Sequence, residues 1–261
     1  MAAPSHSILD REAVEGCLPK LLMASNKTDS SALHDITYIG ALKKWTGFRQ
    51  DVQDRMLDFP PDKTVIDYHH QSRDLREEEV YVADETGVQG RFQQSVGQIL
   101  GTVLGSQEVN IRFGDSKSAG TKYQKIPDVA IVSRDTPAIY KAVGELKTPW
   151  VEAHKLTRRY GKEKALRAVI GQVVEYMIDE KVRFGFHSTY QETIFLRCIQ
   201  AGSEWRIEYS PIFDRASVRR CFWHFSLLAA EARPLRAHPP KRFLIRSGEK
   251  SKPKQEEKTK R

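Results

Sequence analysis

The sequence predicts a mixed α/β (α+β) domain in which helices flank a central sheet whose first strands form an antiparallel meander. From Asp84 onward, helical and strand-like periodicities alternate in the order helix, three strands, helix, strands, helix. The three strands are separated by connections short enough to favour pairing between chain neighbours. The 261 residues are 39% hydrophobic, which is sufficient for a large core.

Each element is predicted from its own periodicity. The first helix covers 84–105, where Val88, Phe92 and Val96 recur every three or four positions and Gly105 marks the end. The three meander strands are expected at "EVNIRF" (108–113), "IPDVAIV" (126–132) and "AIYKAVGELKTPW" (138–150). A second helix is expected over 164–181, three more strands over 183–190, 192–200 and 204–212, and a closing helix over 216–232.

Residues 1–80 are predicted to form a helical extension of the main domain, which itself spans 81–236. Two stretches, 8–24 and 41–59, carry apolar residues at helical spacing. Ser7 is a candidate cap for the first stretch, and Pro60 is expected to stop the second.

The charge of the chain is concentrated at its C-terminal end. The net charge is +8, and residues 241–261 contribute +6 of it (nine Lys or Arg minus three Glu). The segment 237–261 is therefore predicted to be a basic, disordered tail, either a nuclear-localisation or nucleic-acid-tethering segment or a solubilising terminus. Three widely spaced cysteines favour neither disulfides nor a thiolate zinc site, and no membrane span is expected. An intracellular protein is expected, with the nucleus favoured over the cytoplasm.

Two of the predicted strands each carry an acid in an apolar run. If 126–132 and 138–150 form a hairpin, Asp128 opposite Glu145 gives an index sum of 273 (128 + 145) and a turn centred at 136.5, inside the turn-like "SRDTP". Opposed residues share a face, with Cβ atoms about 5 Å apart. Lys147 lies on the same face because side chains alternate with a period of two. Two carboxylates and one lysine are therefore expected to converge.

That trio is suited to phosphodiester hydrolysis. The carboxylates can hold a hard cation that polarises a phosphoryl oxygen, and the lysine can position water or offset developing charge. The alternative is a simple ion pair between Lys147 and Asp128 or Glu145 on an edge strand, and the spacing alone leaves both interpretations open.

The motifs resemble those of the PD-(D/E)xK nucleases, a superfamily with a restriction-endonuclease-like fold. "PD" stands at Pro127 and Asp128, and "ELK" at Glu145 to Lys147. The expected order of helix, meander, helix and strand is also that of the family core, and "QVVEY", Gln172 to Tyr176, matches a Gln-x-x-x-Tyr motif of some members. The pattern is similar to nuclease-like domains of filamentous fungi, some of which are linked to protein-kinase-like modules. The resemblance covers about half of the chain.

The resemblance implies a metal-dependent nuclease, a hydrolase of nucleic acid. Asp128, Glu145 and the backbone carbonyl of Leu146 would bind Mg²⁺ or Mn²⁺, and Lys147 would act on the water. Glu85 matches the acid that the first helix often supplies, for a second ion or its water, although a first-turn acid also stabilises a helix dipole. Gln172 would steady the strand or the nucleic-acid backbone, the alternative being a solvated or core-edge glutamine.

A basic segment directly after the last meander strand is a candidate nucleic-acid interface. It offers phosphate contacts and one aromatic ring for stacking on a base, although a solvated loop is the competing interpretation. Its candidate residues, with one from the helical motif, are Lys155, Arg158, Arg159, Tyr160, Lys162, Lys164, Arg167 and Tyr176. The partners to consider are DNA, favoured over RNA, a second copy of the chain and a kinase-like protein. A nuclease-fold module that binds without turnover is the alternative function.

Overall fold

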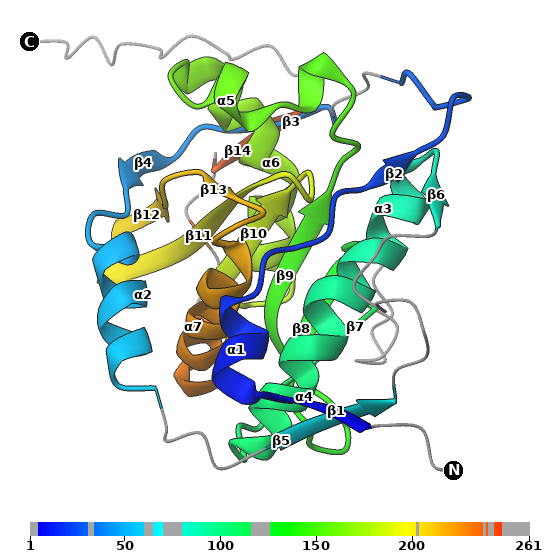
Figure 1. Cartoon of the computed structure of the whole chain (residues 1–261). Helices are drawn as coiled ribbons and strands as arrows, with labels where there is room; N and C mark the ends of the chain where they lie inside the picture. The colour runs from blue at the N-terminus through cyan, green and yellow to red at the C-terminus, as the bar shows by residue number, and fades with distance from the viewer. Residues whose placement is uncertain are drawn as a thin grey trace, which may run out of the picture.

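The structure is a computed structural model that describes residues 5–30, 34–59, 65–69, 80–115, 126–201, 204–236, 239 and 243–246. It has the predicted mixed α/β class: a large mixed sheet lies between helices on both faces (Figure 1). Among the described residues, no helix is both long and apolar enough to cross a membrane.

The main sheet contains eight strands. They are β4 (Ala41–Lys44), β7 (Arg112–Gly114), β8 (Val129–Val132), β9 (Tyr140–Leu146), β10 (Phe184–Ser188), β11 (Glu192–Ala201), β12 (Glu204–Tyr209) and β13 (Phe213–Asp214). The spatial order is β4-β12-β11-β10-β9-β8-β7, with β13 paired to β11. Among the described residues of this sheet, β9–β10 and β12–β4 pair in parallel and the other neighbouring strands pair antiparallel. The predicted antiparallel meander is therefore present as β7, β8 and β9.

The hairpin of β8 and β9 has the predicted register. Val129 lies opposite Gly144 and Ala130 opposite Val143, so each pair has the index sum 273. The register shifts at one bulge between Ile131 and Val132, farther from the acids. The strand ends that carry Asp128 and Glu145 are therefore in phase.

Two helical layers enclose the sheet. On one face lies α6 (Glu163–Asp179), which packs on β9 and β10, while on the other α7 (Val218–Glu231) packs on β9. Residues of β8 and β9 alternate between the two cores because successive strand side chains point to opposite faces. The remaining helices are α1 (Asp10–Glu15), α2 (Phe48–Leu57), α3 (Glu85–Phe92), a π-helical turn (Gln93–Gln98), α4 (Ile99–Ser106), a 3₁₀ helix (Glu152–His154) and α5 (Leu156–Arg159).

Residues 1–80 are not purely helical as predicted: α1 and α2 lie within the two predicted helical stretches, but strands also form among the described residues of this region. Ala41–Lys44 forms the sheet strand β4, and β3 (Ile36–Tyr38) packs on α6. Trp45 and Phe48 are fully buried in the main core. A four-residue strand followed by a helix mimics one continuous helical pattern, because short apolar runs carry little periodicity.

Other segments of the N-terminal region form small two-stranded sheets. Ser7 is not a helix cap, since it lies in β1 (Ser5–Leu9), which pairs with β5 (Val65–His69). The strand β2 (Leu22–Met23) pairs in parallel with β6 (Tyr81–Val82), directly before α3. The N-terminal residues thus belong to the main fold.

The predicted disordered tail also needs correction at its start. β14 (Leu244–Arg246) pairs antiparallel with β3, and Phe243 beside it is buried. The ring of Phe243 meets that of Tyr38 edge-on, with centroids 4.8 Å apart. Three consecutive apolar residues suffice to anchor this segment despite its basic surroundings. The rest of 237–261, apart from residue 239, lies outside the described residues.

Candidate metal centre

Three carboxylates from three separate elements meet at one end of the sheet. Glu85 is the first residue of α3, Asp128 directly precedes β8, and Glu145 is the penultimate residue of β9. One oxygen from each lies within 4.8 Å of the others, so the group could hold a metal ion. Figure 1 shows the start of α3 and the end of β9 on the upper side of the molecule, where α5 also lies.

Hydrogen bonds to both its side chain and its backbone carbonyl hold Asp128 in this cluster. The Leu146 amide donates a 2.8 Å hydrogen bond to Asp128 Oδ2. The Gln89 side-chain amide, one turn along α3 from Glu85, donates to the Asp128 carbonyl. Asp84 caps α3 by accepting a 2.8 Å hydrogen bond from the Gly87 amide, which fixes where Glu85 begins the helix. These hydrogen bonds connect the β8–β9 hairpin to α3 beside Glu85 and Asp128.

Lys147 binds two of the three acids. Its Nζ lies 2.6 Å from Glu145 Oε1 and 3.1 Å from both Glu85 carboxylate oxygens. The side chains of Lys147 and Glu145 are only 6% and 4% exposed, whereas that of Glu85 is 42% exposed. Glu85 is therefore the open side of the cluster, and Lys147 and Glu145 form its buried base.

The environment favours the charged forms of this buried pair. Burial opposes ionisation of Glu145, but the hydrogen bond with His34 and the charge of Lys147 together hold the pKa of Glu145 below its ordinary value. Burial likewise opposes protonation of Lys147, but Glu145 and then Glu85 raise its pKa above the ordinary value. The ammonium thus neutralises part of the negative charge where the carboxylates meet.

No cationic side chain in the described part of the chain forms an ion pair with Asp128. Burial, followed by the charge of Glu145, raises the pKa of Asp128 to about 8. Its ordinary value is 3.8. Between these two pH values the folded state binds more protons at Asp128 than the unfolded state, so this group lowers stability as the pH rises. A cation beside Asp128 would remove that penalty by stabilising the ionised form.

Cation binding is therefore expected to depend on pH through Asp128. Below about pH 8 the cation must displace the Asp128 proton, so the affinity for Mn²⁺ should rise by about tenfold per pH unit and level off above pH 8. Isothermal titration with Mn²⁺ between about pH 6 and pH 9 measures this slope. The variant Asp128→Asn should bind more weakly and lose the slope. An affinity that stays constant from pH 6 to pH 8 would contradict the assignment of Asp128.

Three histidines lie near Glu145 and Lys147, and no local sequence pattern predicts this placement. His34 Nε2 lies 3.5 Å from Glu145 Oε1. His187 is opposite Glu145 in the parallel register of β10 and β9 and is fully buried, which lowers its pKa to about 3 and keeps it neutral. His154 is also buried, with Nδ1 3.0 Å from Thr148 Oγ1 beside Lys147. Only knowledge of the strand order and of the β3 position could have grouped them.

An N-terminal segment borders the open side of the cluster. The Thr28 amide donates to the Ala83 carbonyl at 2.9 Å, and Trp150 Nε1 donates to the Thr28 carbonyl at 2.8 Å. The Lys27 ammonium lies 5.9 Å from the centre of the Trp150 ring. This segment joins the start of α3 to the end of the β9 region, so residues before 80 help to shape the site.

Gln172 and Tyr176 face the segment that leads into β8. Gln172 Nε2 donates to the Tyr176 hydroxyl at 2.5 Å, and this hydroxyl donates to the Ile126 carbonyl at 3.5 Å. Both side chains are buried, and burial followed by the charge of Glu145 raises the pKa of Tyr176. Gln172 is therefore linked to the segment before β8 through Tyr176, and its role in steadying a strand stays a prediction. The burial of Tyr176 argues against a surface contact with nucleic acid.

The basic segment divides into residues used by the fold and residues that face solvent. Arg167 donates from Nη1 to the Tyr38 and Gly40 carbonyls and pairs with Glu163. Tyr160 packs against the α6 core, and its hydroxyl donates to the Ser210 carbonyl at 3.2 Å, so its ring is part of the fold and not an open stacking platform. Arg158, Lys162 and Lys164 are exposed, whereas Lys155 and Arg159 are half-buried.

Comparison with known proteins adds no family assignment. No protein-family model, no curated protein and no solved structure matches this chain. The function proposed below therefore depends on the chemistry of the cluster and on the motif resemblance.

Proposed function

We propose that this protein is a divalent-metal-dependent nuclease with a restriction-endonuclease-like core. The observation that carries the proposal is the convergence of Glu85, Asp128 and Glu145 within 4.8 Å, with the Lys147 ammonium bonded to two of them. Buried charged groups are costly, and clusters of them are typical of functional sites.

The donor set fits a hard cation such as Mg²⁺ or Mn²⁺. All three candidate side-chain ligands are carboxylates, which are the side chains preferred by these ions. Burial, followed by the charge of Glu145, raises the pKa of Asp128, and a cation would offset both effects by stabilising the ionised form. Asp128 and Glu145 would hold the ion with the Leu146 carbonyl, and Glu85 would complete the site from its exposed side. When bound, the cation supplies a Lewis acid for the phosphoryl oxygen and the attacking water.

The remaining roles follow from the contacts of Lys147. Its ammonium has three donors, and Glu145 and Glu85 now occupy them. Glu85 is the more exposed partner and the pair to it is longer, so Lys147 can release Glu85 and turn toward a water or a phosphate oxygen. There it would orient the nucleophile and offset charge that develops in the transition state. Glu145 would keep the lysine in place meanwhile.

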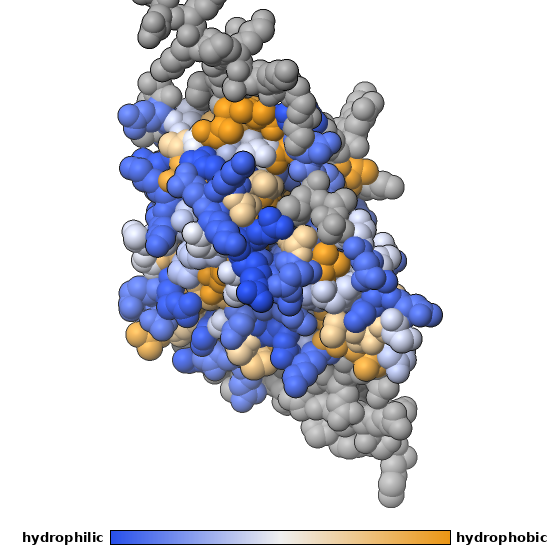
Figure 2. Space-filling model, turned by 90° about the horizontal axis from the view of Figure 1, so that it is seen from above, coloured by the Kyte–Doolittle hydropathy of each residue, from blue (hydrophilic) through white to orange (hydrophobic). Residues whose placement is uncertain are grey.

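We propose nucleic acid as the substrate, with DNA favoured over RNA on the basis of the motif resemblance. Figure 2 shows that the face seen from above is mostly hydrophilic with scattered hydrophobic groups, and α5 lies on this upper side of the molecule in Figure 1. A polyanion is a suitable partner for a chain of net charge +8. Nuclear localisation, self-association and a kinase-like partner remain proposals of lower rank.

Cleavage assays test the proposal directly. Purified protein is incubated with supercoiled plasmid, linear duplex, single-stranded DNA and RNA in Mg²⁺, Mn²⁺ or EDTA. Cleavage of at least one substrate with a metal ion, and none in EDTA, is the expected result. Binding of a substrate without cleavage under any of these conditions would refute turnover and favour the alternative, a nuclease-fold module that only binds.

A further inference from the structure

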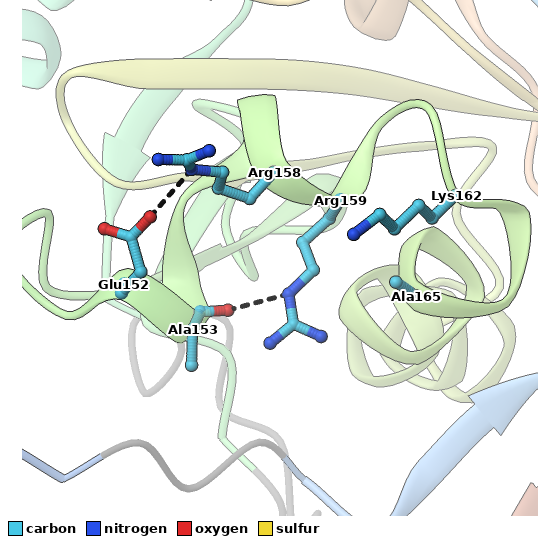
Figure 3. Close-up of a pocket in the computed structure, with 6 residues that line it drawn as sticks. All are labelled: Glu152, Ala153, Arg158, Arg159, Lys162 and Ala165. Atoms are coloured by element: carbon cyan, nitrogen blue, oxygen red, sulfur yellow. Dashed lines mark hydrogen bonds and ion pairs between the residues drawn. The ribbon is translucent and has the colours of Figure 1, made fainter.

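A second site of interest is a basic pocket near the acid cluster. It lies between the 3₁₀ helix Glu152–His154, the short helix α5 and the start of α6. Its volume is about 290 Å³, which is large enough for a phosphate group with water. Figure 3 shows its lining residues, which are Glu152, Ala153, Arg158, Arg159, Lys162 and Ala165.

The cations of this pocket differ in how they are paired. Glu152 is shared between two cations, with Arg158 Nε 2.8 Å from Oε1 and Lys155 Nζ 2.5 Å from Oε2. Arg159 Nε donates a 3.1 Å hydrogen bond to the Ala153 carbonyl, which orients the guanidinium. Within the part of the chain that the structure describes, its two terminal nitrogens have no hydrogen-bond partner. Among the described residues, no carboxylate forms an ion pair with Arg159 or Lys162. The pocket therefore carries three cations and one acid, a net charge of +2.

Arg159 and Lys162, the two cations without a carboxylate partner among the described residues, line the same pocket. Figure 3 shows the Lys162 amino group directed toward Arg159 across the pocket. Two like charges in one hollow repel each other unless an anion lies between them. A phosphate offers several acceptor oxygens and can bind a guanidinium through two parallel hydrogen bonds while also contacting an ammonium. This chemistry fits the pocket better than a carboxylate, which has only two oxygens.

The pocket is tied to the acid cluster by a short, ordered segment. Glu152 is five residues after Lys147, so the two Cα atoms are at most about 18 Å apart. His154, in the 3₁₀ helix that forms one wall, bonds to Thr148 directly after Lys147. A strand bound in the pocket could therefore reach the acids within a few nucleotides.

We propose that this pocket binds one phosphate group of the nucleic-acid strand, at a fixed distance from the phosphodiester that lies at the acid cluster. The inference rests on the proposed function for the location of the scissile bond, but phosphate binding itself requires no cleavage. The group is either a terminal phosphate or an internal phosphodiester, which share this chemistry. Arg159 and Lys162 contact it, and Ala165 leaves the space that it occupies.

Binding without turnover tests the pocket. Fluorescence anisotropy with labelled single-stranded and duplex oligonucleotides, in EDTA and in Ca²⁺, is measured from low to high salt for the wild type and for Arg159→Ala/Lys162→Ala. The double variant is expected to bind on the order of tenfold more weakly, with the slope of log affinity against log salt reduced by about 1 to 2. Ala165→Leu, which fills the pocket without changing its charge, should weaken binding as well.

Lys43→Ala/Lys181→Ala is the matched control. Both lysines are exposed and neither lines the pocket, so the loss of the same number of charges there should change affinity by much less. Equal losses in this control and the Arg159→Ala/Lys162→Ala variant, or an unchanged salt slope, would overturn the pocket in favour of diffuse attraction. Absence of any wild-type binding would overturn it too. Thermal unfolding of each variant shows whether the fold is kept.

Modified oligonucleotides identify which phosphate is bound. Oligonucleotides with a 5′ phosphate, a 3′ phosphate or neither distinguish a terminal group, and single uncharged methylphosphonates locate an internal one. The expected result is one position whose modification weakens wild-type binding but not that of the double variant. A wild type that shows this pattern but never cuts would refute the proposed nuclease activity and support the phosphate pocket. Cleavage that is independent of Arg159 and Lys162 would support the nuclease activity and refute the pocket.

Discussion

Glu145→Gln and Lys147→Met are both expected to lower the cleavage rate by at least about 10³-fold. The two substitutions should nevertheless differ in cation binding. Glu145→Gln removes a carboxylate ligand, so Mn²⁺ binding should weaken together with cleavage. Lys147→Met removes a positive charge that lies 2.6 Å from Glu145 and 3.1 Å from Glu85, so Mn²⁺ should bind at least as tightly as in the wild type. Isothermal titration and plasmid cleavage on the same samples measure both quantities.

This contrast separates an active site from a buried ion pair. A structural ion pair predicts no change in cation affinity for either variant, only loss of stability. Glu231→Gln, at the exposed end of α7, is a suitable control because it removes a carboxylate outside the cluster. Retention of cleavage by either Glu145→Gln or Lys147→Met, in protein shown to be folded, would remove the basis for the proposed mechanism.

The parts of the fold that were predictable from the sequence are those set by local pattern. The hairpin of β8 and β9 closes through a short turn, so its register followed from the positions of two acids and a turn. The spacing of Gln172 and Tyr176 on α6 likewise needed only helix geometry, and their side chains do meet. Local information therefore sufficed for Asp128, Glu145 and Lys147.

The parts that were missed depend on pairing between distant segments. The edge strand β4 pairs with β12, where Ala41 is opposite Arg206, and no local signal marks that partner. His187 lies beside Glu145 because β10 returns parallel to β9 after α6, and strand order is not encoded in either strand alone. His34 reaches the same carboxylate only because β3 is packed on α6. Apolar residues at 243–245, too few to predict a strand, complete that packing through β14.

Gly171→Ala is expected to destabilise the protein by displacing β3 from α6. A Cβ atom at Gly171 would lie 2.2 Å from the Ile36 carbonyl oxygen, far inside contact distance, and this backbone atom cannot rotate away as a side chain could. The expected loss in the free energy of unfolding is about 1–3 kcal/mol. Thermal unfolding followed by circular dichroism should show a midpoint lower by about 3–10 °C. Because His34 is two residues before Ile36, cleavage at a temperature where the variant is folded should fall as well.

Gly101→Ala provides the matched control with the opposite sign. Gly101 lies within α4, where an added Cβ would have no neighbour within 4 Å, so alanine should raise stability by about 0.5–1 kcal/mol through its better helix propensity. If Gly171→Ala unfolds at the same temperature as Gly101→Ala, β3 is not seated against α6. If instead Gly171→Ala is destabilised but cleaves normally while folded, the position of His34 beside Glu145 contributes nothing to the chemistry, and the acids and Lys147 alone must support it.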